Sequence, residues 1–148
     1  MKRFISHADA MEALGSDIAR DHREGGIIYL QGELGAGKTT LARGIIRAFG
    51  ITEPVKSPTY TLVESYTASG RLSPRLRIYH LDLYRLQDPE ELEYIGIRDY
   101  FGEKAMFLIE WPERGKGGIP APDLVVSIAV LAPGRLVTLG NAGCIPKI

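Results

Sequence analysis

Cysteine is almost absent from this 148-residue sequence, and neither sign of charge is in excess. The single cysteine, Cys144, excludes an intramolecular disulfide and fits a reducing compartment, so we expect a cytoplasmic protein. Lys and Arg together number 18, as do Asp and Glu, so the formal charge is zero. This balance argues against a stand-alone nucleic-acid-binding protein, because binding to a phosphate backbone depends on clustered positive charge.

Long apolar runs are also missing. The longest near-apolar stretch, residues 124–132, includes Ser127 and is far shorter than the roughly 20 residues that a membrane-spanning helix needs. Near the N-terminus, His7 and Asp9 interrupt what would be the apolar core of a signal peptide. We therefore expect no membrane partner. The length predicts one domain, which we place at residues 1–139, followed by a tail at 140–148.

The spacing of the apolar residues predicts helices and strands that alternate along the first part of the chain. Helices are expected from a capping box at Ser6 and Asp9, over residues 39–49, and from Asp88 to about residue 95. Strands are expected at residues 27–30, 60–66, 77–83, 105–109, 124–131 and 135–139, the last two forming a hairpin. Residues 110–122, with three prolines and three glycines, predict a loop.

Residues 32–39, GELGAGKT, match the phosphate-binding pattern G-x-x-x-x-G-K-[ST] between a predicted strand and a predicted helix. Gly35 and Gly37 let the backbone turn its N–H groups inward, and the helix N-terminus adds a favourable interaction with an anion. We expect Lys38 to reach the β- and γ-phosphates and the Thr39 hydroxyl to bind Mg²⁺. A glycine-rich connection without a ligand is the alternative. The motif predicts an α/β, three-layer fold of the P-loop NTPase kind, with a mostly parallel central sheet and an antiparallel C-terminal hairpin.

Two acidic residues are candidates for the carboxylate that such a site needs beside the metal. Glu110 ends the apolar run at 105–109, and Asp82 lies at the end of the strand that contains Ile78 and His80. One of the two is expected to contact the groups that bind the metal and not the metal itself, because Mg²⁺ keeps several of its waters. Ser57 and Thr59 precede the next strand, where a hydroxyl can respond to the γ-phosphate, although a plain turn is equally compatible with their positions.

The remaining features narrow the class of P-loop protein. The sequence has no Asn-Lys-x-Asp guanine-binding motif, which favours ATP over GTP. Only the loops at 67–75 and 110–122 are left to form an acceptor site, so a small-molecule kinase is the second hypothesis. A nucleotide-dependent scaffold, whose hydrolysis matters only inside a complex, is the third. No arginine stands out as a catalytic finger, so we expect slow hydrolysis by the isolated chain.

Four segments together resemble the bacterial TsaE family: GELGAGKTT at 32–40, KSPTYTLVESY at 56–66, IYHLDLYRLQDPEELEYIGIRDYF at 78–101 and IEWPERG at 109–115. The resemblance covers nearly the whole chain to about residue 139. It implies a small ATPase required for threonylcarbamoyladenosine formation on tRNA. It also implies a TsaD–TsaB complex as the partner, which carries the transfer chemistry and engages the tRNA, so that contact with tRNA is only indirect.

The same resemblance assigns roles to individual residues. Thr39 and Glu110 match the magnesium ligands of the family, Lys38 matches its phosphate-binding lysine, and Asp82 matches its other essential carboxylate. Nucleotide contacts are implied around Ala8 and at Gly134. The cofactors are thus expected to be ATP and Mg²⁺, with the catalytic residues Lys38, Asp82 and Glu110. The expected nucleotide-binding residues are Ala8, Gly35, Ala36, Gly37, Lys38, Thr39, Thr40 and Gly134.

Overall fold

A single seven-stranded sheet organises the computed structural model, which describes residues 1–58 and 61–141. Its strands follow the order β1-β7-β6-β2-β5-β4-β3. The central strands are parallel: β6 (Leu124–Leu131), β2 (Gly26–Gly32), β5 (Ala105–Glu110) and β4 (Arg77–Asp82). The outer strands run antiparallel to their neighbours: β3 (Val63–Thr67), β7 (Gly134–Gly140) and β1 (Lys2–Ile5). The predicted parallel centre and antiparallel C-terminal hairpin are confirmed.

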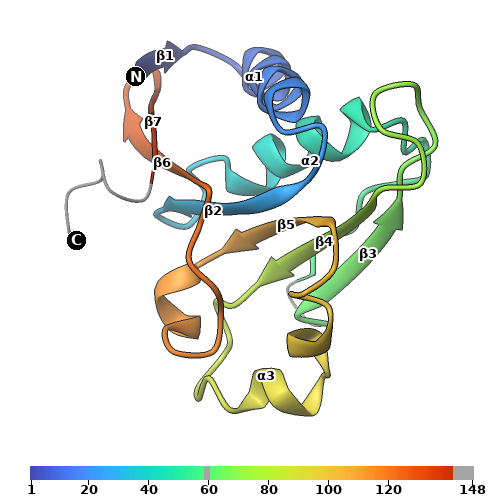
Figure 1. Cartoon of the computed structure of the whole chain (residues 1–148). Coiled ribbons are helices and arrows are strands. Elements are labelled where there is room, and N and C mark those ends of the chain that lie inside the picture. Colours follow the sequence, from blue (N-terminus) through green and yellow to red (C-terminus); the bar gives the residue numbers. More distant parts are fainter. Residues whose placement is uncertain (59–60, 142–148) are drawn as a thin grey trace.

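Helices lie on both faces of this sheet, which gives three layers (Figure 1). The helices α1 (Ala8–Asp21) and α2 (Lys38–Ala48) pack together on one face. On the other side lie the short helix α3 (Glu91–Tyr94) and the single 3-10 turns η1 (Ile97–Asp99) and η2 (Pro112–Gly115). Among the described residues no helix is both long and apolar enough to cross a membrane.

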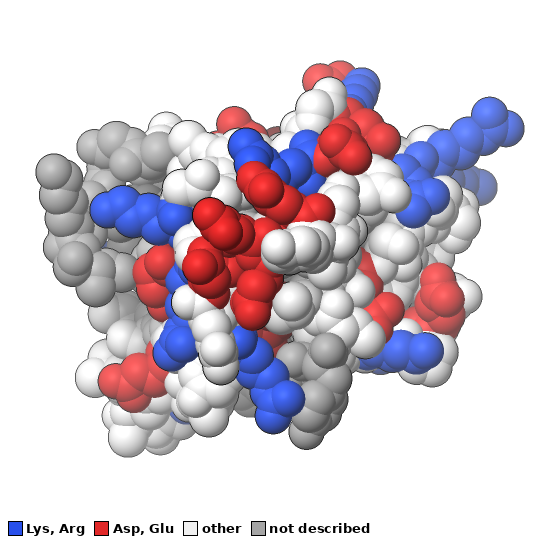
Figure 2. All heavy atoms as spheres, turned by 90° about the horizontal axis from the view of Figure 1, so that it is seen from below, with Lys and Arg blue, Asp and Glu red and all other residues white. Residues whose placement is uncertain are grey.

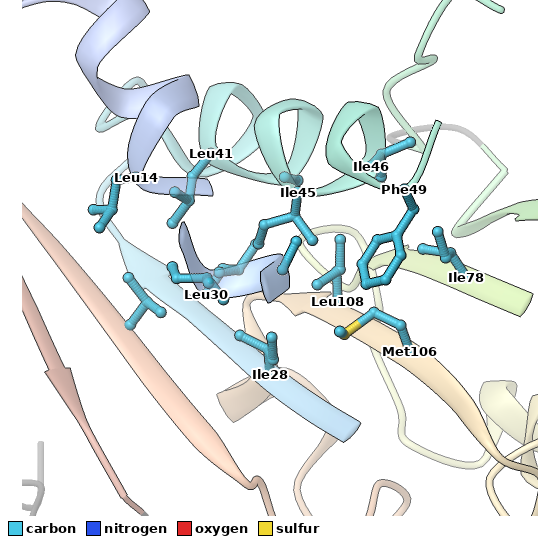
Figure 3. Packing of buried hydrophobic residues seen from close by; sticks show 14 of the residues in the cluster. Leu14, Ile28, Leu30, Leu41, Ile45, Ile46, Phe49, Ile78, Met106 and Leu108 are labelled. Carbon is cyan, nitrogen blue, oxygen red and sulfur yellow. The ribbon is translucent and has the colours of Figure 1, made fainter. Parts of the chain in front are cut away.

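The larger core lies between α2 and the sheet (Figure 3). The buried face of α2 repeats with helical spacing, whereas the strands contribute every second residue, as expected for a helix packed on a sheet. This packing holds the N-terminus of α2 above the carboxyl ends of β4 and β5. The side chains labelled in the close-up are Leu41, Ile45, Ile46 and Phe49 of α2 and its cap, Leu14 of α1, and Ile28, Leu30, Ile78, Met106 and Leu108 of the strands.

Two glycines allow the close contact between α1 and α2. A Cβ atom on Gly44 would lie 2.4 Å from the backbone oxygen of Glu12, and one on Gly15 would lie 2.7 Å from the backbone oxygen of Leu41. Both distances are shorter than any real Cβ contact, so the two helices can approach this closely only without side chains at these positions.

Several element boundaries differ from the predicted ones. The N-terminal cap of α1 is His7 instead of Ser6, and the Nδ1 atom of His7 accepts a hydrogen bond from the Ala10 N–H at 3.1 Å. The strand expected at 60–66 is found at 63–67. It begins after Leu62, which has a left-handed backbone conformation with φ of 66° and donates its N–H to the Pro58 carbonyl. Residues 59 and 60 lie outside the described residues.

Three further elements depart from the expectation. The helix predicted from Asp88 to about residue 95 is only α3, although the Asp88 carboxylate accepts the Glu90 N–H at 2.9 Å and so caps the turn before it. The predicted 110–122 loop contains η2. The strand β1 was not predicted, because only Ile5 of its four residues is buried and its partner β7 is far away in the sequence.

Candidate functional site

The phosphate-binding motif forms the loop that connects β2 to α2. Gly35 has a φ of 81° and Gly37 a φ of 115°, both in the left-handed region that residues with a side chain rarely adopt. Gly37 is also the N-terminal cap of α2, and its carbonyl accepts the Leu41 N–H at 3.0 Å. The loop therefore needs glycine at these two motif positions, and it ends at the positive end of the α2 dipole.

Lys38 lies at the start of α2 and is only 5% exposed. Its ammonium group donates to the Gly32 carbonyl at 2.6 Å and to the Glu33 carbonyl at 2.8 Å. The Trp111 ring lies beside the same group, with its centroid 4.4 Å from Nζ, a geometry that allows a cation–π interaction. Burial lowers the pKa of Lys38, and the negative charge of the nearby Glu110 is the largest effect that opposes the shift.

Thr39 and Glu110 meet directly in front of the helix N-terminus. The Thr39 hydroxyl lies 3.2 Å from each carboxylate oxygen of Glu110, which is 2% exposed. The Oε2 atom of Glu110 also lies 2.6 Å from Nε2 of His80 on the neighbouring strand. A hydroxyl and a carboxylate from two distant parts of the sequence thus converge on one point at the carboxyl edge of the sheet.

Asp82 is aligned with Glu110 across the parallel β4–β5 pair and is 7% exposed. Its Oδ1 atom accepts the Tyr84 N–H at 3.0 Å, which fixes the turn that follows β4. Its own backbone N–H donates to the Leu62 carbonyl at 3.0 Å. Through Leu62 the strand end that bears Asp82 is joined to the segment after Ser57. The predicted nucleotide-sensing position Thr59 lies outside the described residues.

Two adjoining cavities share the phosphate-binding loop. The first, of about 450 Å³, contains the predicted catalytic and metal-binding side chains, Lys38, Thr39, Asp82 and Glu110, together with Ser57. The second, of about 270 Å³, contains the other predicted nucleotide contacts, Ala8, Ala36 and Gly134. Gly35, Gly37 and Thr40 border both cavities. The predicted catalytic, metal-binding and nucleotide-binding residues therefore all line one of two cavities that share the phosphate-binding loop.

Arg135 joins the late hairpin to the loop. Its guanidinium donates to the Ala36 carbonyl at 2.9 Å and to the Gly35 carbonyl at 3.3 Å, and also to the Gly134 carbonyl at 3.0 Å. Gly134 itself needs to be glycine, because a Cβ atom there would lie 2.3 Å from the backbone oxygen of Ile5 in β1. The two hydrogen bonds to the loop occupy the carbonyl groups of Gly35 and Ala36, and Arg135 lines the second cavity with them.

The oxygen atoms at Thr39 and Glu110 suit a hard divalent cation. Among the described residues no three His, Cys, Asp or Glu side chains gather into a metal-binding cluster. Mg²⁺ does not need one, since it usually binds through one or two carboxylates plus substrate phosphates and waters. The residues present therefore fit Mg²⁺ held jointly with a nucleotide, and they do not fit a metal held by protein ligands alone.

The sequence did not predict the contacts that three residues make in the site. The position of Trp111 over Lys38 was not predicted. Trp111 is half-buried, and its backbone has a left-handed φ of 56°, an uncommon conformation for a bulky residue. His80 shared an alternating strand face with Asp82, a signal that could have placed it near the acids. For Arg135 we find no signal in the sequence, because its contacts depend on how β7 packs.

Comparison with known proteins places the chain in a family. A family model described as "Threonylcarbamoyl adenosine biosynthesis protein TsaE" matches residues 5–135. The tRNA threonylcarbamoyladenosine biosynthesis protein TsaE of Haemophilus influenzae is 52% identical over 113 residues, which cover 76% of this chain and 68% of that protein. The protein of the same name from Treponema pallidum is 37% identical over 121 residues, covering 82% of this chain and 85% of that protein.

A solved structure agrees with the sequence comparison. The crystal structure of Bacillus subtilis YdiB superimposes with a TM-score of 0.78 at 27% identity, covering 97% of this chain and 86% of that one. The resemblance that the four sequence segments suggested is confirmed: the chain belongs to the TsaE family of tRNA threonylcarbamoyladenosine biosynthesis proteins.

Proposed function

We propose that this protein is the Mg²⁺-dependent ATPase of the tRNA threonylcarbamoyladenosine system and that it acts with a TsaD–TsaB complex. One observation carries the proposal: the Thr39 hydroxyl lies 3.2 Å from the Glu110 carboxylate, beside the buried Lys38 and at the N-terminus of α2. This combination of a phosphate-binding loop, a hydroxyl and an acid is the constellation that P-loop enzymes use for ATP with its metal.

In this proposal each group has a defined task. The backbone N–H groups of residues 35–39 and the Lys38 ammonium would bind the phosphates, and Thr39 and Glu110 would hold Mg²⁺. The chemistry that Mg²⁺ would supply there is neutralisation of the negative charge on the phosphate oxygens. Asp82, aligned with Glu110 at the end of β4, orients the water molecules on this side of the site. Trp111 covers Lys38 and limits the access of bulk water to it.

The partner supplies both the activation and the contact with tRNA. Figure 2 shows the α3 side of the molecule, where Asp and Glu side chains gather near the middle, with Lys and Arg around them. An acidic surface repels a phosphate backbone, and the chain has no net positive charge to offset this. We therefore assign tRNA binding to TsaD–TsaB and ATP hydrolysis to this chain.

A lysine substitution tests the nucleotide site. Lys38→Ala removes the only side-chain cation that we assign to the phosphates, so we expect no measurable ATP binding by calorimetry. Lys104→Ala, at an exposed position remote from both cavities, is the matched control and is expected to bind ATP like the wild type. ATP affinity in Lys38→Ala equal to that of the control would overturn the phosphate-binding assignment.

A second substitution tests the metal. Glu110→Ala is expected to retain much of the nucleotide binding but to lose Mg²⁺-dependent phosphate release, and Glu24→Ala, an exposed acid, is the control. An unchanged rate in Glu110→Ala would refute its role. The kinase hypothesis is tested in the same assay by supplying candidate small-molecule acceptors. Transfer of labelled phosphate to an acceptor other than water would support the kinase hypothesis and overturn the ATPase proposal.

The partner is tested by binding. We expect immobilised TsaD–TsaB to retain this chain in an ATP-dependent manner and to raise its rate of hydrolysis. Failure to bind with ATP, with ADP and without nucleotide would refute the proposed partnership while leaving the ATPase proposal standing.

A further inference from the structure

His80 is a polar residue in an apolar layer. It lies in β4 on the face directed toward α2, between Ile78 and Asp82 on the same face, and is completely buried. Its aligned neighbour in β5, Leu108, is also completely buried. An aliphatic or aromatic side chain would fill this position without desolvating a polar group, so packing alone does not explain a histidine here.

The two nitrogen atoms of the imidazole ring have different surroundings. Nε2 lies 2.6 Å from Oε2 of Glu110, and because a carboxylate only accepts hydrogen bonds, the Nε2–H of His80 donates. Nδ1 has no hydrogen-bond partner among the described residues, although it is buried. Leaving a buried polar atom unpaired is destabilising, and the hydrogen bond to Glu110 is the contact that the imidazole makes in return.

Glu110 is consequently held from two directions. The Thr39 hydroxyl contacts both of its carboxylate oxygens, and His80 contacts Oε2 from the neighbouring strand. With only the Thr39 contact, the carboxylate could rotate about its last side-chain bond, since a hydroxyl at the same distance from both oxygens does not select an orientation. The imidazole donor selects one.

We propose that His80 is a positioning residue that holds the Glu110 carboxylate in the orientation needed to share one divalent cation with Thr39. This inference rests on the proposed function, in which Thr39 and Glu110 hold Mg²⁺. Hydrogen-bond partners of metal ligands commonly contribute in this way, and removing one typically costs about 10–100-fold in metal affinity. His80 itself does not contact the nucleotide or the metal.

The test measures metal affinity separately from nucleotide affinity and from turnover. The full chain is saturated with a non-hydrolysable ATP analogue, Mn²⁺ is titrated in, and free Mn²⁺ is followed by electron paramagnetic resonance. Binding of the same analogue is measured separately in EDTA. The variants are His80→Phe, which keeps an aromatic ring but has no donor, and His80→Gln, whose side-chain amide keeps an N–H donor.

Two controls separate positioning from general damage. Tyr79→Phe changes the opposite face of the same strand by removing a hydroxyl that contacts Glu103, and His22→Gln makes the same chemical change far from the site. Both are expected to bind Mn²⁺ like the wild type. Circular dichroism and thermal unfolding establish that each variant is folded before its affinities are compared.

For His80→Phe we expect the Mn²⁺ dissociation constant to rise about 10–100-fold while analogue binding in EDTA stays within about threefold of the wild type. We expect His80→Gln to recover part of the loss. A folded His80→Phe with wild-type Mn²⁺ affinity would overturn the inference. If His80→Phe does not fold, His80→Leu, which also has no donor, takes its place: Mn²⁺ affinity about 10-fold weaker or more supports positioning, and unchanged affinity contradicts it.

Failure of the proposed function would look different. In that case the wild-type protein itself would bind neither the ATP analogue nor Mn²⁺, and the inference would fall with it. If the wild type binds both, and the His80 variants do so equally well, only the positioning role is refuted.

Discussion

Substitution of Arg135 by methionine tests whether the late hairpin shapes the phosphate-binding loop. Methionine keeps much of the apolar stem but removes the donors to the Gly35 and Ala36 carbonyls. These bonds fix the positions of the two carbonyl groups and so restrict the conformation of the loop beside the cavity that Arg135 also lines. Without these bonds the loop populates other conformations. Nucleotide affinity then falls in proportion to the fraction of molecules that keep the binding-competent conformation.

The expected magnitude follows from the two bonds. A hydrogen bond to a charged group contributes about 1.5–3 kcal/mol when buried. The bond to Ala36 is partly buried at 2.9 Å, but the bond to Gly35 is exposed and 3.3 Å long, and water can replace it. We therefore expect a loss of about 1–2 kcal/mol in total, which corresponds to about 5–30-fold weaker ATP binding.

The assay is calorimetric ATP binding at fixed salt, with thermal unfolding to confirm folding. Arg135→Lys retains the charge but not the fixed geometry of the guanidinium, so it separates the two contributions, and we expect it to resemble Arg135→Met. Arg3→Met on β1 is the control, because Arg3 pairs with Asp17 away from the loop. ATP affinity in Arg135→Met within twofold of the control would refute the reasoning.

Two further predictions concern the helix contact and the buried lysine. Gly44→Ala places a Cβ atom 2.4 Å from the Glu12 carbonyl oxygen, so we expect the free energy of unfolding to fall by about 1–3 kcal/mol, as measured by thermal or urea unfolding. Gly102→Ala is the control: a Cβ atom there has no neighbour within 4 Å, so we expect no change in stability. For Lys38, burial lowers the pKa below the ordinary 10.5, and bound phosphates favour the charged form. ATP affinity is therefore expected to fall as the pH rises, beginning at a lower pH than the ordinary lysine pKa would give, and ATP binding at alkaline pH is expected to take up protons. Calorimetry that shows no decline in ATP affinity below pH 10.5 would contradict this.

The sequence predicted the parts of the fold that local patterns encode. The strand–loop–helix around Lys38 follows from one short motif, and the strand ending at Glu110 from a continuous apolar run. The approach of Glu110 to Thr39 could be anticipated because carboxyl ends of parallel strands share one edge of a sheet. For these features, the residue types and their positions along the chain are sufficient to predict the geometry.

What sequence reasoning missed depends on packing between distant segments. The strand β1 has a single buried residue, so its alternation carries no signal, and it exists through its pairing with β7. His7 caps α1 although histidine is not among the usual capping residues. The contacts of Trp111 with Lys38 and of Arg135 with the loop likewise arise only when separate elements meet.

A crystal structure with Mg²⁺ and a non-hydrolysable ATP analogue is the most direct test of the site. We expect the triphosphate to lie along the backbone N–H groups of the loop. We expect the metal to be bound by the Thr39 hydroxyl and to face the Glu110 carboxylate. A triphosphate bound elsewhere, or a metal with Glu110 turned away from it, would contradict the assignment.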